Sequence, residues 1–236
     1  MKKTVFVGDG LTNGYPGVSY FRFLPKDAGL IRCGRNGDTL LKSMERMNRM
    51  LVEDEYQDVE RYVLQLGLGD ALLPTLRLHS KWWRVFVDLK ATYLGCVPCL
   101  SIEQFRERYE RLLVKLRANK KAIAVIGLPY VENRTLTLGA TVGRYNAEIK
   151  ELCSKYKVPF LDLYELEKKE LGKQQGSYFV GKTGMGMVLD SLFTSVLPFS
   201  NAVSKVRGLS VTVDGIHMNY RMAKKVAKMV ELKLIE

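Results

Sequence analysis

Four short blocks of the chain combine glycine with side chains that can do chemistry. They are residues 8–12 (GDGLT), 34–39 (GRNGDT), 67–70 (GLGD) and 214–219 (DGIHMN). Aspartate and histidine transfer protons or orient one another through hydrogen bonds near neutral pH, and glycine lets a backbone approach a ligand closely. Blocks of this kind could form a catalytic site, provided that the fold brings them to one place.

The pattern of apolar residues predicts the strands and helices that would bring these blocks together. Short apolar runs, each typical of a strand buried on both faces, occupy residues 4–7, 30–33, 61–66, 122–126 and 158–163. Apolar residues recur at helical spacing within residues 40–51, 102–116, 142–152 and 223–234. This alternation predicts an α/β fold, a three-layer α/β/α sandwich around a central parallel sheet of about five strands. Working residues of such folds gather at the carboxyl ends of the strands, where three of the four blocks lie.

The composition is that of an ordinary globular protein, with 47% hydrophobic and 26% charged residues among 236. No linker or repeat divides the chain, so we expect one domain over residues 1–236. No apolar run reaches the ~18 residues of a membrane helix. A secretory signal is not indicated either, because Asp9, Gly10 and Asn13 interrupt the first apolar stretch. We expect the protein to begin near residue 1 and to be cytoplasmic.

The net charge of +12 could attract nucleic acid, anionic lipid or an acidic partner. Lys and Arg are nevertheless spread over several segments that they share with Glu on amphipathic patterns, and no RNA-binding signature occurs. A basic solvated surface is therefore favoured over nucleic-acid binding. Cys96 and Cys99 form a CxxC without a second pair nearby, so we expect no disulfide framework, metal or cofactor.

Residues 176–183 (GSYFVGKT) match the phosphate-binding pattern G-x-x-x-x-G-K-[ST]. That loop works only between a strand and a helix, and the preceding residues 168–175 are charged and polar. We interpret the match as a chance feature of an insertion, and we do not expect Lys182 to bind an anion. His79 follows no motif and is predicted to lie in a loop.

The four blocks, in this order, resemble those of the SGNH or GDSL hydrolases, a family of esterases, lipases, thioesterases and deacetylases with a flavodoxin-like fold. The family's blocks read G-D-S-L-T, S-G-D-T, G-x-N-D and D-G-I-H-P-N. The resemblance implies that His217 is the catalytic base and Asp214 the carboxylate that orients it. It also implies that Gly10 and Gly37 contribute to the oxyanion hole together with the position of Gly69, and that Asp9 and Asp70 adjoin the site.

Two positions depart from the family pattern. Gly10 stands where the family has its nucleophilic serine, and Gly69 stands where it has the asparagine of the oxyanion hole. No acyl-enzyme can form on a glycine, and one lost oxyanion donor typically lowers the rate by ~10². The resemblance thus implies a relative of acyl-ester hydrolases with a degenerate catalytic centre. Such a protein would bind a small acylated or ester-like ligand or hydrolyse it very slowly, and two separate replacements favour natural divergence.

Several alternatives remain open at this point. His217 and Asp214 could activate a water in the space beside Gly10, which would make the chain an active esterase without a covalent intermediate. Another hydroxyl could replace the serine, and the candidates near in sequence are Thr12, Ser19 and Ser43. The Asp214–His217 pair could instead be a hydrogen-bonded corner that has only a structural role. The alternative outside the enzymes is a basic protein whose surface binds nucleic acid or an acidic partner.

We further expect that Gly10→Ser together with Gly69→Asn would restore esterase activity, and that two insertions cover the mouth of the site. The first covers residues 72–100 and contains Trp82, Trp83, Phe86 and Tyr93. The second covers residues 172–209, and its inward apolar face would consist of Met185, Met187, Leu192, Phe193, Leu197 and Phe199.

Overall fold

A five-stranded parallel sheet forms the centre of the molecule. The structure, a computed structural model, describes residues 3–26, 28–132, 137–172, 176–181, 184–196 and 199–235, with the backbone alone for residues 184–187 and 235. The strands lie in the order β2-β1-β3-β4-β5. Their bounds are β1 (Lys3–Gly8), β2 (Leu30–Gly34), β3 (Val59–Gln65), β4 (Ala122–Ile126) and β5 (Phe160–Leu161). The predicted fold class is confirmed, although β5 is much shorter than the apolar run that indicated it.

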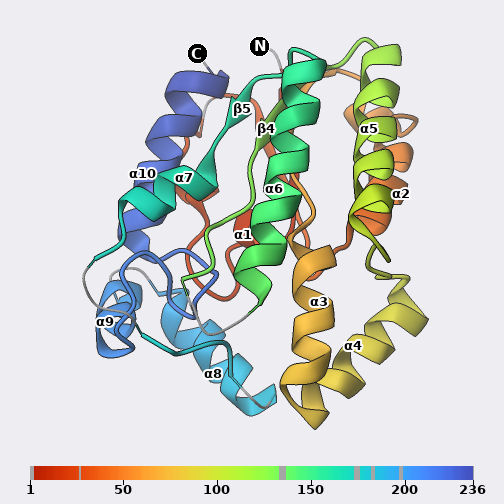
Figure 1. Cartoon of the computed structure of the whole chain (residues 1–236). Helices are drawn as coiled ribbons and strands as arrows, with labels where there is room; N and C mark the ends of the chain where they lie inside the picture. Colours follow the sequence, from red (N-terminus) through yellow and green to blue (C-terminus); the bar gives the residue numbers. More distant parts are fainter. Residues whose placement is uncertain are drawn as a thin grey trace.

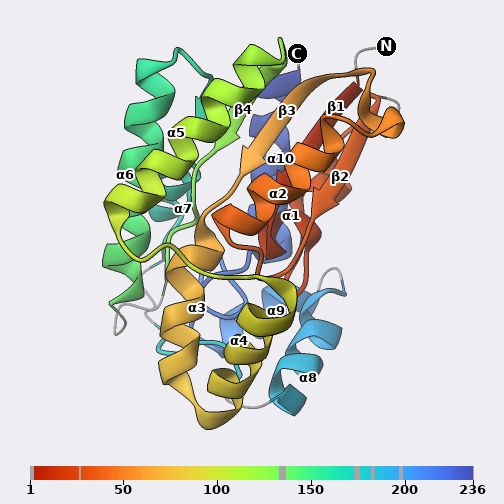
Figure 2. The same ribbon diagram turned by 90° about the vertical axis from the view of Figure 1, so that its right-hand side faces the viewer.

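Helices cover both faces of this sheet (Figures 1 and 2). One face carries α2 (Leu40–Met50), α5 (Ile102–Ala118) and α6 (Leu138–Lys155), and the other carries α1 (Gly10–Asn13) and α10 (Tyr220–Val230). Val5, Phe6 and Val7 of the central strand β1 have no exposed surface, as expected for a strand between two helical layers. The remaining elements are η1 (Tyr20–Phe23), η2 (Asp54–Tyr56), α3 (Leu68–His79), α4 (Lys81–Leu94), α7 (Leu163–Lys169), α8 (Gly184–Thr194), α9 (Phe199–Val206) and η3 (Glu231–Ile235).

At the carboxyl edge of the sheet, two groups of helices extend the molecule downward in Figure 1, α3 with α4 and α8 with α9. The helices α3 and α4 pack on each other and form the first predicted cover segment. His79, predicted to lie in a loop, is instead the last residue of α3, and its ring packs edge-on against Phe179. None of the described helices is long and apolar enough to cross a membrane.

The prediction for the apolar face of the second cover segment is wrong for the three of its six residues whose side chains the structure describes. Leu192, Phe193 and Phe199 point outward, with 61%, 62% and 63% of their surfaces exposed. The inward positions of α8 are polar because their partners lie inside: the hydroxyl of Thr194 accepts a hydrogen bond from the backbone N–H of Gly17. Met185, Met187, Leu197 and the phosphate-loop residue Lys182 lie outside the described residues or side chains.

Candidate active site

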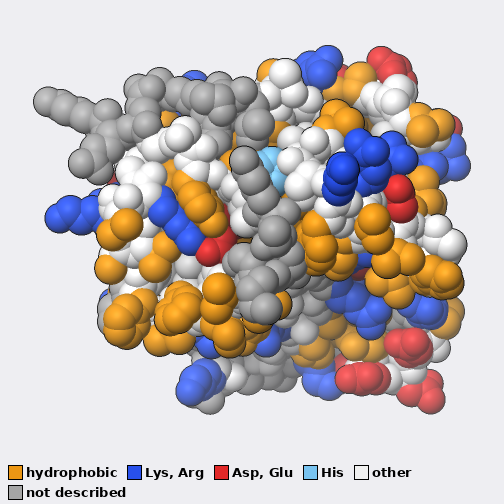
Figure 3. All heavy atoms as spheres, turned by 90° about the horizontal axis from the view of Figure 1, so that it is seen from below, with side chains coloured by type: hydrophobic (Ala, Val, Ile, Leu, Met, Phe, Trp, Pro, Cys, Tyr) orange, Lys and Arg blue, Asp and Glu red, His pale blue; other side chains and the backbone are white. Residues whose placement is uncertain are grey.

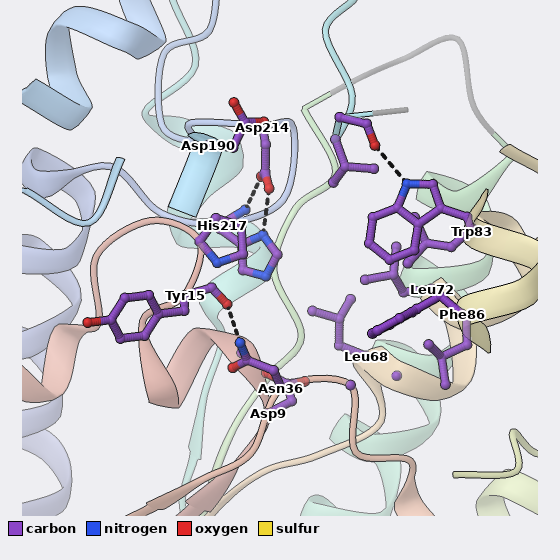
Figure 4. Close-up of a pocket in the computed structure, with 18 of the residues that line it drawn as sticks. Asp9, Tyr15, Asn36, Leu68, Leu72, Trp83, Phe86, Asp190, Asp214 and His217 are labelled. Atoms are coloured by element: carbon purple, nitrogen blue, oxygen red, sulfur yellow. Dashed lines mark hydrogen bonds and ion pairs between the residues drawn. The ribbon is translucent and has the colours of Figure 1, made fainter. Parts of the chain in front are cut away.

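The sequence blocks converge on one pocket at the carboxyl edge of the sheet (Figure 4). Gly10 begins α1 directly after β1, Gly37 lies between β2 and α2, and Gly69 lies in the first turn of α3 after β3. Asp214 and His217 come from the loop before α10. All five residues line the pocket. Gly37 has a φ of +69°, in the left-handed region, where glycine carries no steric penalty.

Asp214 holds the imidazole of His217 in a fixed orientation. One carboxylate oxygen of Asp214 lies 2.7 Å from Nδ1 of His217. The other accepts hydrogen bonds from the backbone N–H groups of Ile216 and His217, at 3.1 and 2.8 Å. Both side chains are buried. Because Nδ1 is bound to the carboxylate, Nε2 is directed at Gly10, and a Cβ atom built on that glycine would lie 3.0 Å from Nε2.

The electrostatics of the pair favour an imidazolium. Burial by itself lowers the pKa of His217, but the charge and hydrogen bond of Asp214 outweigh burial, so this pKa lies above its ordinary value. Burial raises the pKa of Asp214, but the attraction of His217 and the hydrogen bonds to this carboxylate outweigh that effect and lower it. An aspartate that orients and charges a histidine is the arrangement of a general base in acyl transfer.

Asp9 is a second carboxylate at the pocket. Its Oδ1 caps α1 by accepting the N–H of Leu11 at 3.0 Å, whereas its buried Oδ2 has no hydrogen-bond partner among the described residues. Burial therefore raises the pKa of Asp9 to about 6, although the Leu11 N–H and the nearby His217 act in the opposite direction. Two carboxylates thus act on the charge of one imidazole, because Asp9 also raises the pKa of His217.

The hydroxyls proposed as substitute nucleophiles lie away from the pocket. The Thr12 hydroxyl donates to the side chain of Gln65 at 2.9 Å, and Ser19 donates to the backbone oxygen of Thr12 at 2.7 Å. Thr12, Ser19 and Ser43 are buried and do not line the pocket. Among the described residues that line it, none is a serine, threonine or cysteine. The described wall therefore offers no serine, threonine or cysteine nucleophile to His217, and Tyr15 carries the one side-chain hydroxyl among these lining residues.

The place of the family's oxyanion asparagine is filled by backbone. A Cβ atom on Gly69 would lie 2.1 Å from the carbonyl oxygen of Asp38, which no side chain can approach so closely. Asp38 is itself held by an ion pair with Arg46 at 2.9 Å. This contact argues against the expectation that Gly69→Asn would simply add a donor, because the segment around Asp38 occupies the room that this side chain needs. Asp70, the next residue, accepts the N–H groups of Leu40 and Cys99.

An apolar wall continues from the dyad into a cavity of about 200 Å³ (Figure 4). Leu68, Leu72 and Leu76 contribute successive turns of α3, and Trp83 and Phe86 contribute the facing side of α4. The ring N–H of Trp83 donates to the backbone oxygen of Gly181 at 2.7 Å, which links α4 to the second cover segment.

Several of these pocket residues escaped sequence reasoning. Leu68, Leu72 and Leu76 recur every four residues from the third block onward, a signal that could have identified the wall. Asn36 lies within the second block, whereas Lys90 had no signal of either kind. Lys90 donates to the backbone oxygen of Asn36 at 2.7 Å across two segments that are distant in sequence.

The cysteine pair lies beside the site without forming a metal centre with it. Cys96 and Cys99 are buried, and burial, the charge of Asp70 and a hydrogen bond with Asp70 raise the pKa of the Cys99 thiol to about 12. In the part of the chain that the structure describes, no group of three or more His, Cys, Asp or Glu side chains could hold a metal ion.

The sheet order, the glycine turns after three strands and the Asp–His pair before the last helix define the class of SGNH-type α/β hydrolases. The sequence profile described as "GDSL-like Lipase/Acylhydrolase" matches residues 5–230, so the chain belongs to this family. A comparison with curated protein sequences found no significant match.

Solved structures agree with this fold. A lipase/acylhydrolase from Enterococcus faecalis superposes with a TM-score of 0.59 at 17% identity, over 98% of this chain and 93% of the other. The acetyl xylan esterase AlAXEase gives 0.59 at 15% identity, over 99% and 100% of the two chains. The acetylxylan esterase Axe2 from Geobacillus stearothermophilus gives 0.61 at 12% identity, over 98% and 93%. At these identities the similarity concerns the fold.

Proposed function

We propose that this protein binds a small acylated or ester-like ligand in the pocket beside His217, and that it hydrolyses such a ligand very slowly by activating water. The observation that carries the proposal is the oriented Asp214–His217 pair, which faces a glycine at the mouth of an apolar cavity. The retained pair can accept a proton, and the leucine and aromatic wall suits a hydrocarbon chain. Without a hydroxyl at position 10, no acyl-enzyme forms there.

The mechanism of the slow reaction follows from this geometry. A water in the space beside Gly10 would donate a hydrogen bond to Nε2 of His217, and its oxygen would attack the carbonyl carbon of the bound ester. The imidazole takes the proton of that water, the carbonyl oxygen becomes the oxyanion, and the proton is then returned to the leaving alkoxide. Gly37 remains as a backbone donor candidate, whereas Gly69 offers no side-chain donor. Asp214 stabilises the imidazolium that forms in this step.

The size of the cavity favours a short or medium acyl group. Its volume of about 200 Å³ is below the range of pockets for drug-sized ligands, which begins near 300 Å³. Both tryptophans of the chain, Trp82 and Trp83, lie on α4, and Trp83 lines the pocket. Occupancy of the pocket should therefore change the tryptophan fluorescence.

The test is a titration with methyl esters from acetate to decanoate, followed by tryptophan fluorescence and by isothermal titration calorimetry. We expect saturable binding that is strongest at intermediate length. Leu72→Gln should weaken it at least tenfold, whereas Leu100→Gln, at a residue 89% exposed and outside the pocket, should not. Absence of binding at every length would refute the ligand site. Slow hydrolysis of 4-nitrophenyl butyrate that disappears in His217→Ala would support water activation, and turnover unchanged in that variant would refute it.

A further inference from the structure

In the part of α8 whose side chains are described, residues 188–194, the polarity is inverted relative to that of an ordinary surface helix. Its outward positions are apolar and 46% to 62% exposed: Val188, Leu189, Leu192 and Phe193, followed by Val196 just beyond the helix at 52%. Its inward positions, in contrast, are polar. Asp190 is buried and pairs with Arg207 and with the hydroxyl of Tyr178, and Thr194 is fully buried. A helix that keeps its polar side chains inside and its apolar side chains outside is suited to an apolar environment on its outer side.

A second exposed apolar row lies on α4. Val85, Leu89 and Tyr93 recur every four residues and are 58%, 49% and 77% exposed. The adjoining side of the same helix contributes Trp83 and Phe86 to the pocket. We call the outward residues of α8 and α4 together the apolar collar. The pocket lies between its two halves, since residues of α4 and Asp190 of α8 line it from either side.

Figure 3 views this end of the molecule. Hydrophobic side chains gather on both sides of the face, with Lys and Arg side chains among them. The segment of residues 77–100, which contains α4, carries four basic residues and one acidic residue. Lys81 and Arg84 are exposed beside the apolar row, and the acidic residue, Asp88, is paired with Arg77 at 2.7 Å. The collar therefore combines exposed apolar area with positive charge.

We propose that the apolar collar docks this protein on an anionic lipid bilayer surface, with the mouth of the pocket facing the lipid. Apolar side chains inserted to the level of the lipid headgroups, next to Lys and Arg that contact anionic headgroups, are the mode of binding of interfacial helices. The net charge of +12 supports the same partner, because it attracts the whole molecule to a negative surface. The helices α4 and α8, which carry the two rows, lie at the same end of the molecule (Figures 1 and 2), and we infer that a flat surface contacts both rows at once. The inference goes beyond the proposed function, since docking does not require hydrolysis.

Cosedimentation with sucrose-loaded vesicles tests the proposal. We expect the full chain to sediment with phosphatidylcholine/phosphatidylglycerol vesicles (1:1) and to bind phosphatidylcholine vesicles at least tenfold more weakly. The double variant Leu192→Ser/Phe193→Ser should lower the partition coefficient at least tenfold. The matched control Val52→Ser/Leu232→Ser changes two residues, 73% and 55% exposed, that lie toward the opposite edge of the sheet, and it should bind as the unmodified protein does.

The tryptophans of α4 report which face contacts the lipid. Vesicles with brominated acyl chains should quench the fluorescence of Trp82 and Trp83 in the unmodified protein, a readout that needs no variant. Binding without quenching would place the contact on another face and would overturn the proposal. Failure to sediment with anionic vesicles would overturn it too. So would sedimentation-velocity data that show a dimer for the unmodified protein and a monomer for Leu192→Ser/Phe193→Ser, because the collar would then be an interface between copies.

Discussion

Nε2 of His217 lies 3.0 Å from the position that a Cβ atom on Gly10 would occupy. At this distance the imidazole is in place for a hydroxyl that the chain does not have, and a small side chain fits with a shift of a few tenths of an ångström. The nearest other neighbours of that point are the backbone oxygen of Tyr15 at 3.4 Å and Oδ1 of Asn36 at 3.6 Å.

Gly10→Ser should therefore create a nucleophile. We expect hydrolysis of 4-nitrophenyl butyrate to rise at least ~10²-fold above that of the unmodified protein, because the serine completes a triad whose base is already oriented. Gly10→Ala adds the same Cβ without the hydroxyl and is the control. A gain that survives when His217→Ala is added to Gly10→Ser, or an equal gain in Gly10→Ala, would contradict this prediction.

Gly69→Asn should destabilise the protein, with or without Gly10→Ser. The new Cβ meets the carbonyl oxygen of Asp38, and overpacking against backbone typically costs about 1–3 kcal/mol, or about 2–12 °C in Tm for a chain of this length. Gly69→Ala, which has the Cβ but no amide, should lower Tm similarly in a thermal melt followed by circular dichroism. A Tm that is unchanged in both variants would contradict this prediction, because the backbone around Asp38 would then move away from the new Cβ atom without a measurable loss of stability.

The imidazole of His217 should titrate with a pKa above 6.5, and Asp214→Asn should move that pKa downward. Asp214 supplies the charge that opposes the effect of burial, and burial alone favours the neutral ring. Proton NMR resolves the two histidines of the chain, and His79→Gln assigns them. In Gly10→Ser, esterase activity should rise with pH through the same pKa, because only the neutral imidazole acts as a base. A pKa that does not respond to Asp214→Asn would refute the coupling.

Asp9→Asn should change how stability depends on pH. The pKa of Asp9 is raised by folding from 3.8 to about 6, so its favourable contribution is complete below pH 3.8 and is lost as the pH rises through 6. A shift of this size corresponds to about 3 kcal/mol. Relative to the unmodified protein, the variant should therefore gain up to about 3 kcal/mol in free energy of unfolding between pH 4 and pH 8, measured by urea denaturation. A difference that is constant over this range would contradict the raised pKa.

Much of this architecture follows from local sequence. The apolar runs before Gly8 and Gly127 and the helical spacing of Phe105, Leu112 and Leu116 require only short-range pattern, and the sheet order with its helical layers agrees with them. The position of the four glycine blocks at one pocket could be predicted because parallel strands bring their carboxyl ends together.

What local pattern could not supply are contacts between distant segments. An apolar run by itself indicates burial, but Leu192 and Phe193 face outward. The inward side of α8 carries Asp190, which pairs with Arg207, and Thr194, which accepts a hydrogen bond from the N–H of Gly17. The contact between Gly69 and the carbonyl oxygen of Asp38 likewise joins two loops that are separate in sequence. The roles of Asp214 and His217 remain predictions that the variants above test.

The same backbone contact makes the two glycine positions unequal. A serine at position 10 needs one substitution, because the space and the oriented imidazole are present. An asparagine at position 69 needs more than one substitution, since the carbonyl oxygen of Asp38, whose side chain pairs with Arg46, occupies the room that its Cβ requires. A variant that gains the hydroxyl would therefore need its second oxyanion donor elsewhere in the pocket, unless the segment around Asp38 also moves.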